Sequence, residues 1–127
     1  MLPEPTDALA GVIDVNELLT RCLGNVEFAG RILAMFQDRC AADVAELQRA
    51  LDIDDAETVA RVAHRLKGAC ANAAALGLKT KASRLEQAAR ELPLPEIAAQ
   101  FHELRSEWLR FKEALAPLDI AAGAASG

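Results

Sequence analysis

The most regular hydrophobic pattern in the chain lies between residues 97 and 115 and has the period of an α-helix. Six apolar residues follow one another there at steps of 4, 3, 4, 3 and 4, namely Ile97, Phe101, Leu104, Trp108, Phe111 and Leu115. This spacing puts all six on one side of a helix. We expect the helix to carry Pro95 in its first turn, where the missing N–H has no partner to lose, and to end at Pro117.

A short helix and a long helix are predicted before it. Asp14 is a good N-cap for the short one, Glu17 three residues later resembles a capping box, and Gly24 closes it. Asn25 then caps a helix that reaches about Leu51. Its apolar stripe consists of Phe28, Ile32, Met35, Phe36, Cys40, Val44, Leu47 and Leu51. Its charged residues fall largely outside that stripe, among them Arg31, Asp38, Arg39, Asp43, Glu46 and Arg49.

Two more helices are predicted between residues 55 and 92. Acidic residues gather at 52–57, where they suit the positive end of a new helix. That helix runs from about Asp55 to Ala74, a break follows near Leu76–Gly77, and the next helix ends near Leu92. The stripe of the second of these helices is Leu78, Ala82, Leu85 and Ala89.

These patterns predict an all-α protein, since no strand-like alternation competes with them. Short connections favour an antiparallel, up-down-up-down four-helix bundle with a short additional N-terminal helix. We expect one domain at residues 13–117, a flexible lead-in at 1–12 and a flexible tail at 118–127.

Composition narrows the class of protein. The 127 residues suit a single domain, and a net charge of −5 argues weakly against nucleic-acid binding. No apolar run is long enough to span a membrane, and the start MLPEPTDALAG does not resemble a signal peptide. We therefore expect a cytoplasmic protein. Cys22, Cys40 and Cys70 are too widely spaced for a zinc or redox motif and are expected to be buried thiols.

The candidate chemistry lies around His64. At about 100° per residue, His64 falls about 140° from the centre of the apolar stripe of its helix and should face solvent. Its neighbours on that face are Ala60, Lys67, Gly68 and Ala71, three of which have almost no side chain.

The glycine is costly, because glycine inside a helix destabilises it by about 1 kcal/mol relative to alanine. Gly68 is four residues after His64, so the absent side chain opens one edge of the imidazole to another protein surface. Lys67 places an ammonium near anything attached to the ring, and Arg61 and Arg65 add positive charge. An exposed neutral imidazole is a nucleophile near pH 7, and its natural anionic adduct here is a phosphoryl group.

The stretch AHRLKGACAN, residues 63–72, resembles the histidine-containing phosphotransfer (HPt) domains of multistep two-component signalling. Leu78, Ala82, Leu85 and Glu86 also fit the family pattern further along the chain. One residue departs from it: the family often has a glycine ten residues after the histidine, where this chain has Ala74 and only later Gly77. The shape of that turn is left open by the sequence.

The resemblance implies that His64 accepts a phosphoryl group on Nε2 from a receiver-domain aspartate and passes it to another receiver. Lys67 would neutralise phosphoryl charge, and Gly68 would give access to the histidine. The implied partners are response-regulator receiver domains and a hybrid sensor histidine kinase, with Mg²⁺ on the receiver and neither metal nor cofactor on this chain. Such a protein is a phosphocarrier without its own ATP site, and we expect a monomer.

The docking surface for these partners is expected around His64, at Ala60, Arg61, Arg65 and Ala71. The sequence leaves open whether a further apolar group contributes to docking or is buried; this group is Leu18, Leu19, Leu23 and Val26.

Two other functions remain as alternatives. The chain could be a helical binding module that docks on a receiver or kinase without being phosphorylated. It could also be a small hydrolase with His64 as base, although no orienting carboxylate or pocket can be placed beside His64 from sequence. His102 is expected to be an ordinary surface residue, and the acids at 52–57 lack the glycine and spacing of a calcium loop.

Overall fold

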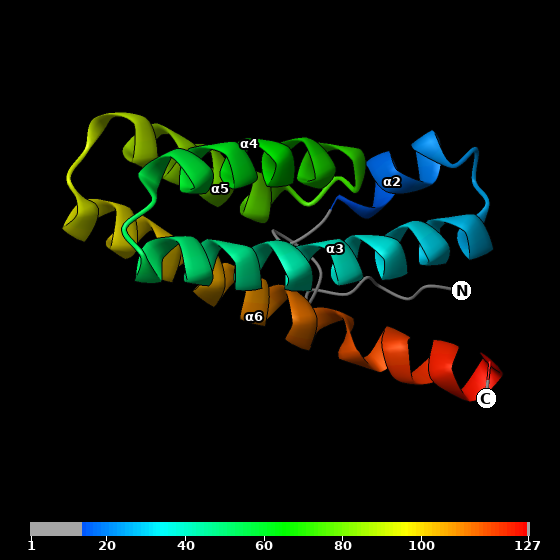
Figure 1. The fold of residues 1–127 in the computed structure, drawn as a ribbon. Helices are drawn as coiled ribbons and strands as arrows, with labels where there is room; N and C mark the ends of the chain where they lie inside the picture. The colour runs from blue at the N-terminus through cyan, green and yellow to red at the C-terminus, as the bar shows by residue number, and fades with distance from the viewer. Residues whose placement is uncertain (1–13, 127) are drawn as a thin grey trace.

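The structure is a computed structural model that describes the backbone of residues 14–126 and the side chains of residue 14 and residues 16–115. The described chain is helical, with no strand (Figure 1). Its helices are α2 (Val15–Arg21), α3 (Val26–Asp52), α4 (Ala56–Asn72), α5 (Leu76–Glu91) and α6 (Leu94–Ser126). The flexible lead-in expected at 1–12 lies outside the described residues.

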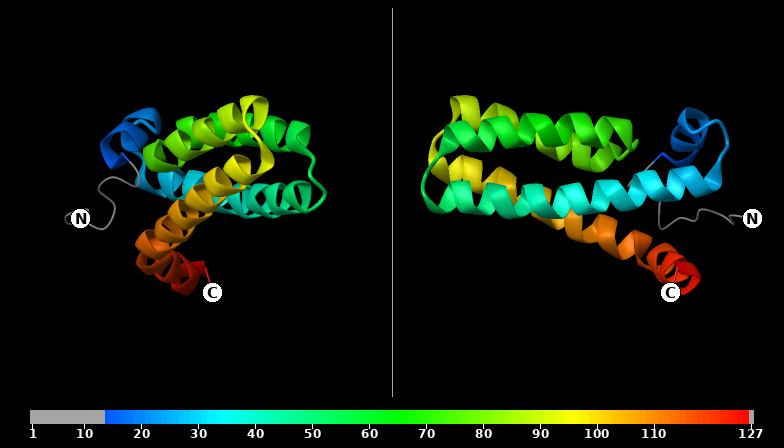
Figure 2. Two further views of the ribbon diagram at one scale, coloured as in Figure 1. Left: turned by 90° about the vertical axis from the view of Figure 1, so that its left-hand side faces the viewer. Right: turned by 45° about the vertical axis from the view of Figure 1, so that its right-hand side comes forward.

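The four long helices form a bundle in which each helix runs antiparallel to the next. α4 packs on both α3 and α5, α6 packs on α5, and α6 also returns to α3, which closes the bundle (Figure 2). The short helix α2 lies beside the start of α3, near the end of the bundle where α4 turns into α5 (Figure 1). The predicted all-α bundle with an additional N-terminal helix is confirmed. No described helix is long and apolar enough to cross a membrane.

Local signals at the helix ends explain why the predicted boundaries are close to those observed. The side chains of Asp14, Asn25 and Asp55 each accept the backbone N–H three residues later, at 2.9 to 3.0 Å. Each such bond satisfies an N–H that the first turn of a helix leaves without a partner.

The core confirms most of the predicted apolar stripes. On α4, Val59, Val62, Leu66 and Cys70 are buried, and so are all six stripe residues of α6. On α5, Leu78, Ala82 and Leu85 are buried, whereas Ala89 of the predicted stripe is only half-buried. Phe36 of α3 packs edge-on against Phe111 with their ring centroids 5.3 Å apart. Cys22, Cys40 and Cys70 are free and buried, as predicted.

Three residues of α3 depart from the prediction. Phe28 and Met35 are exposed, because at about 100° per residue they lie roughly 80 to 100° around α3 from its buried side, which holds Ala29, Phe36 and Cys40. Asp43, predicted to face solvent, is buried, since a partner on α4 reaches it there.

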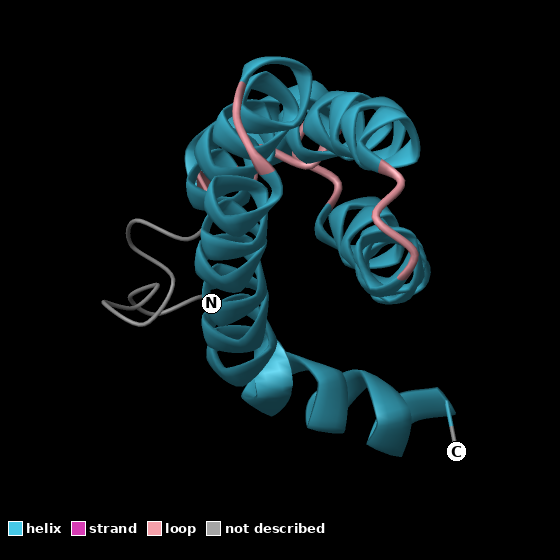
Figure 3. Cartoon of the chain, turned by 60° about the vertical axis from the view of Figure 1, so that its left-hand side comes forward, coloured by secondary structure: helices cyan, strands magenta, loops and turns pink. Residues whose placement is uncertain are grey.

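The prediction that Pro117 ends the last helix is wrong. α6 continues through Pro117 to Ser126, and its C-terminal part bends away from the axis of the rest (Figure 3). A proline inside a helix removes one hydrogen bond and crowds the preceding turn, which bends a helix without having to stop it. The flexibility expected for residues 118–127 stays a prediction.

Candidate functional site

Helix α4 presents His64 to solvent because its apolar residues occupy the opposite side. Val59, Val62 and Leu66 are fully buried against the other helices. His64 lies on the far side of α4 from them, and 64% of its side chain is exposed. The helical period alone predicts this exposure, and the structure confirms it.

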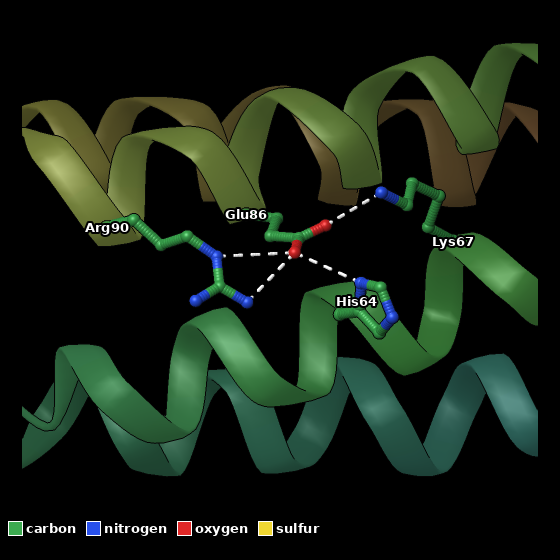
Figure 4. Close-up of polar contacts among 4 residues, drawn as sticks. All are labelled: His64, Lys67, Glu86 and Arg90. Atoms are coloured by element: carbon green, nitrogen blue, oxygen red, sulfur yellow. Dashed lines mark hydrogen bonds and ion pairs between the residues drawn. The ribbon is translucent and has the colours of Figure 1, made fainter.

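Glu86, on the neighbouring helix α5, contacts the imidazole of His64 (Figure 4). Nδ1 of His64 lies 3.0 Å from Oε2 of Glu86, which also accepts from Nη2 of Arg90 at 3.0 Å. The other carboxylate oxygen, Oε1, pairs with Nζ of Lys67 at 2.9 Å. One carboxylate thus joins the imidazole and two cations into a cluster that spans α4 and α5.

This hydrogen bond selects the tautomer of the neutral imidazole. A carboxylate can only accept, so Nδ1 must carry the proton that His64 donates to Glu86. Nε2 is then left with its lone pair. It is the nitrogen farther from Glu86, on a side chain that is mostly open to solvent (Figure 4).

Glu86 remains ionised in these surroundings. Partial burial raises the pKa of its carboxyl, but hydrogen bonds from Lys67 and Arg90, the charge of Lys67 and the bond to His64 lower it more. The net effect brings the pKa of Glu86 down to about 2. Near neutral pH the cluster therefore contains a negatively charged carboxylate beside the imidazole.

The surface on either side of His64 is open. A Cβ built on Gly68 would meet no atom within 4 Å, so no described residue requires a glycine there. In the other direction an open groove is lined by Glu57, Ala60, Arg61, His64, Ala89 and Arg90. Packing within the described part of the chain therefore does not account for the unfavourable glycine.

Of the residues expected at the docking surface, Ala60 is buried and Arg65 is paired with α3. Ala60 is buried at the floor of the groove and offers little surface to a partner, so its placement on an exposed face is wrong. The reason is that α5 packs against α4 there: Ala60 shares the groove with Ala89 and Arg90 of α5. Arg61 is exposed and Ala71 is half-buried.

The side chain of Arg65 is bound to acidic residues of α3. Its Nη2 donates to Oδ1 of Asp43 at 2.6 Å and to Oε1 of Glu46 at 2.8 Å. Asp43 is almost fully buried, and its second oxygen has no hydrogen-bond partner among the described residues. Arg65 therefore compensates a buried charge, which accounts for its side chain without a partner protein.

The turn between α4 and α5 uses Ala74 where the resembled family often has glycine. Ala74 has a φ of +56°, the left-handed conformation that glycine adopts most easily. The N–H groups of Ala74 and Ala75 close the end of α4 by donating to the carbonyls of Ala71 and Cys70 at 3.2 and 2.9 Å. The turn thus keeps a common helix-end geometry and places the conformational strain on an alanine.

Sequence reasoning did not assign Glu86 or Arg90 to the site. In the sequence Glu86 only fits the family pattern, because its place beside His64 depends on the register of α5 against α4. A usable signal was present: Glu86 and Arg90 are four residues apart and form an ion pair along α5. The carboxylate that a hydrolase would need beside His64 is therefore present.

The remaining candidates lie apart from this cluster. His102 is exposed on α6, beside the hollow lined by Asp52 and Asp54. Among the described residues, no three His, Cys, Asp or Glu side chains are grouped as metal ligands. Of the apolar group whose role was open, Leu18 is buried and Leu19 partly so, whereas Leu23 and Val26 are exposed.

Comparison with known protein families shows the family of this chain. The family model of the Hpt domain matches residues 31–116, which include α4, α5 and the whole His64 cluster. The chain belongs to the Hpt domain family, whose members carry phosphoryl groups in two-component signalling. Searches of the curated proteins and of the solved structures found no match.

Proposed function

We propose that this protein is a phosphorelay intermediate that accepts a phosphoryl group on His64 from a receiver-domain aspartate and passes it to another receiver-domain aspartate. The observation that carries the proposal is the bond from Nδ1 of His64 to Glu86, which leaves Nε2 unprotonated on an exposed side chain. A nucleophile in this state needs no separate base to remove a proton before attack.

The proposed phosphoryl transfer needs no external acid or base. The lone pair of Nε2 attacks the phosphorus of the aspartyl phosphate, the P–O bond to aspartate breaks, and the aspartate leaves as a carboxylate. His64 keeps its proton on Nδ1 and becomes a positively charged phosphoimidazole. The ionised carboxylate of Glu86, 3.0 Å away, stabilises that charge. In the reverse transfer the same proton lets His64 leave as a neutral imidazole.

Lys67 and Arg90 are the cations available to the phosphoryl group. In the unmodified protein both pair with Glu86, so their charges are held next to the imidazole before a phosphoryl group arrives. Lys67 lies one turn from His64 on the side of Gly68, where the helix surface is bare. We assign charge neutralisation to Lys67 and access to Gly68.

In the proposed mechanism, the partner domains supply the phosphoryl group and the metal ion. The receiver domain would bring the aspartate and its Mg²⁺, and a hybrid sensor histidine kinase would be the source of the phosphoryl group. This protein would act in the cytoplasm as a monomeric phosphocarrier without its own ATP site or cofactor.

A receiver-binding module that is never phosphorylated is the second candidate. It is favoured by one observation, the open groove beside His64, which a docking surface could use without chemistry. It does not explain the bond between His64 and Glu86 or the cost of Gly68, so we rank it second.

The test is to incubate the protein with receiver domains from the same genome, each phosphorylated with acetyl phosphate. We expect an acid-labile, base-stable phosphate on the wild type and on His102→Gln, and none on His64→Gln. A wild type that binds a phosphorylated receiver without acquiring phosphate would instead establish the binding module.

A further inference from the structure

The charges of this acidic protein are unevenly distributed. Helices α4 and α5 together hold seven Lys and Arg residues and three Glu residues, a net charge of +4. The whole chain has a net charge of −5, so the remaining residues carry −9. The helix pair that contains His64 is therefore a positive part of a negative molecule.

Four of these cations lie on the faces of α4 and α5 that flank His64 and Glu86, and we call them the cationic row: Arg61, Lys67, Lys79 and Arg90. Arg61 and Arg90 line the open groove on one side of His64. Lys67 lies on the other side of the histidine. Lys79 precedes Glu86 by seven residues, which is two helical turns, so it shares the face of α5 with Glu86 about 10 Å further along.

The members of the row differ in what they already bind. Lys67 and Arg90 pair with Glu86 within the His64 cluster. Arg61 and Lys79 are exposed and form no ion pair within the described part of the chain. The carboxylates that Arg61 influences electrostatically are those of Glu46 and Asp55.

We propose that the cationic row is an electrostatic docking surface for the acidic rim of a receiver domain, in which Arg61 and Lys79 speed encounter and orient the partner around His64. This inference rests on the proposed function, since it names what guides the phosphoryl donor to that site. Arg61 and Lys79 are docking residues, and Lys67 and Arg90 serve the phosphoryl group itself.

Charge complementarity favours a compact acidic protein over a nucleic acid. A receiver gathers its carboxylates around one aspartate, and the cationic row is similarly short and centred on one histidine. A nucleic acid is a long polyanion that would extend past the row and meet the negative remainder of this protein. Opposite charges at a protein interface act mainly on the association rate and on orientation.

The chain offers a matched control for this inference. Arg84 is also an exposed cation on α5, but it faces α6, where it lines a hollow with Gln87, Glu91 and Gln100. The variants Arg61→Gln, Lys79→Gln and Arg84→Gln each remove one positive charge. They differ in whether that charge lies on the cationic row.

The experiment measures phosphoryl transfer from an acetyl-phosphate-loaded receiver at limiting and at saturating receiver concentrations. We expect the second-order rate constant of the wild type to fall about ten-fold between about 20 mM and about 500 mM NaCl. Arg61→Gln and Lys79→Gln should each lower it about two- to five-fold at low salt and weaken its salt dependence, with a smaller effect at saturation. Arg84→Gln should change it by less than about two-fold.

The outcomes separate this inference from the proposed function. Phosphate on His64 that forms at a salt-independent rate, or equal losses in Arg84→Gln and Lys79→Gln, would overturn the docking surface and leave the phosphocarrier intact. No phosphate on the wild type would overturn the proposed function. Binding of a DNA or RNA duplex at about 150 mM NaCl that Arg61→Gln and Lys79→Gln abolish would overturn the choice of partner.

Discussion

Glu86 holds His64 through Nδ1 at 3.0 Å while its other oxygen, Oε1, holds Lys67 at 2.9 Å. The carboxylate therefore sets the tautomer of His64 and the position of a neighbouring cation at the same time. Both effects come from a residue that need not touch the phosphoryl group, which makes Glu86 a positioning residue.

The first prediction concerns Glu86→Ala. Without the carboxylate, the neutral imidazole of His64 should populate both tautomers, and the rate of phosphoryl transfer to His64 should fall about ten- to a hundred-fold. The tautomer can be read directly from the ¹⁵N chemical shifts of the imidazole. A variant whose Nδ1 stays fully protonated, with a wild-type transfer rate, would contradict the assigned role.

The second prediction separates stability from function at Gly68. Gly68→Ala should raise the free energy of unfolding by about 0.5 to 1 kcal/mol, because alanine favours a helix and its Cβ meets no atom here. The same variant should slow phosphoryl transfer several-fold, because the added methyl group lies beside the imidazole.

Gly30 provides the control for that pair of effects. It lies inside α3, where an added Cβ also meets no atom within 4 Å. Gly30→Ala should give a similar gain in stability without slowing transfer. Equal transfer rates in both alanine variants would show that Gly68 does not provide access to the histidine.

The sequence alone predicts those features of the fold and site that depend on residues close together in the chain. Asp14, Asn25 and Asp55 mark helix starts because a cap depends on residues three positions apart. The exposure of His64 follows in the same way from the period of α4. Such features do not depend on how the helices are placed relative to one another.

Features that depend on helix register were not predictable in this way. Asp43 is buried because Arg65, 22 residues later, reaches it from the facing helix. Glu86 belongs to the site because α5 aligns it with His64. A single sequence indicates that these residues lie on helices, but it does not give the register that pairs them.

The third prediction tests the strain at Ala74. Its left-handed φ of +56° costs an alanine about 1 to 2 kcal/mol, whereas glycine adopts this conformation freely. Ala74→Gly should therefore stabilise the protein by about 0.5 to 1 kcal/mol, after the larger entropy of glycine in the unfolded chain is counted. Ala73→Gly, at a neighbouring residue with a φ of −94°, should destabilise it. A loss of stability in Ala74→Gly, measured by urea denaturation, would argue against strain at this turn.

The fourth prediction concerns the pair of Arg65 and Asp43. Arg65→Ala should destabilise the protein by about 2 to 4 kcal/mol, because it leaves a buried carboxylate without its counter-charge. Adding Asp43→Leu should restore much of that loss, since the unpaired charge is then removed as well. If Arg65→Ala instead left stability unchanged and weakened receiver binding, Arg65 would belong to the docking surface as the sequence suggested.

The fifth prediction is a dependence of stability on pH that Glu86 produces. Its folded-state pKa of about 2 is below the ordinary value of 4.5, so folding favours the ionised form. The stabilisation should be complete above about pH 5 and should be lost as the pH falls through 4.5 towards 2. We expect about 1 to 2 kcal/mol, which allows for the partial exposure of Lys67 and Arg90.

The measurement compares the urea unfolding of the wild type and Glu86→Gln between pH 7 and pH 2. Asp55 and Glu46 also have lowered pKa values, because Thr58 and Arg65 respectively donate hydrogen bonds to them, so the wild type alone cannot isolate Glu86. The difference in stability between the two proteins does isolate Glu86, because both contain those carboxylates.

This difference in stability should shrink as the pH falls, and it should shrink at neutral pH in a Lys67→Met background. Lys112→Met, which removes a cation that lies over Trp108 on α6, should leave it unchanged. A difference that stays constant down to pH 2 would show that Glu86 stabilises the fold by packing and not by charge.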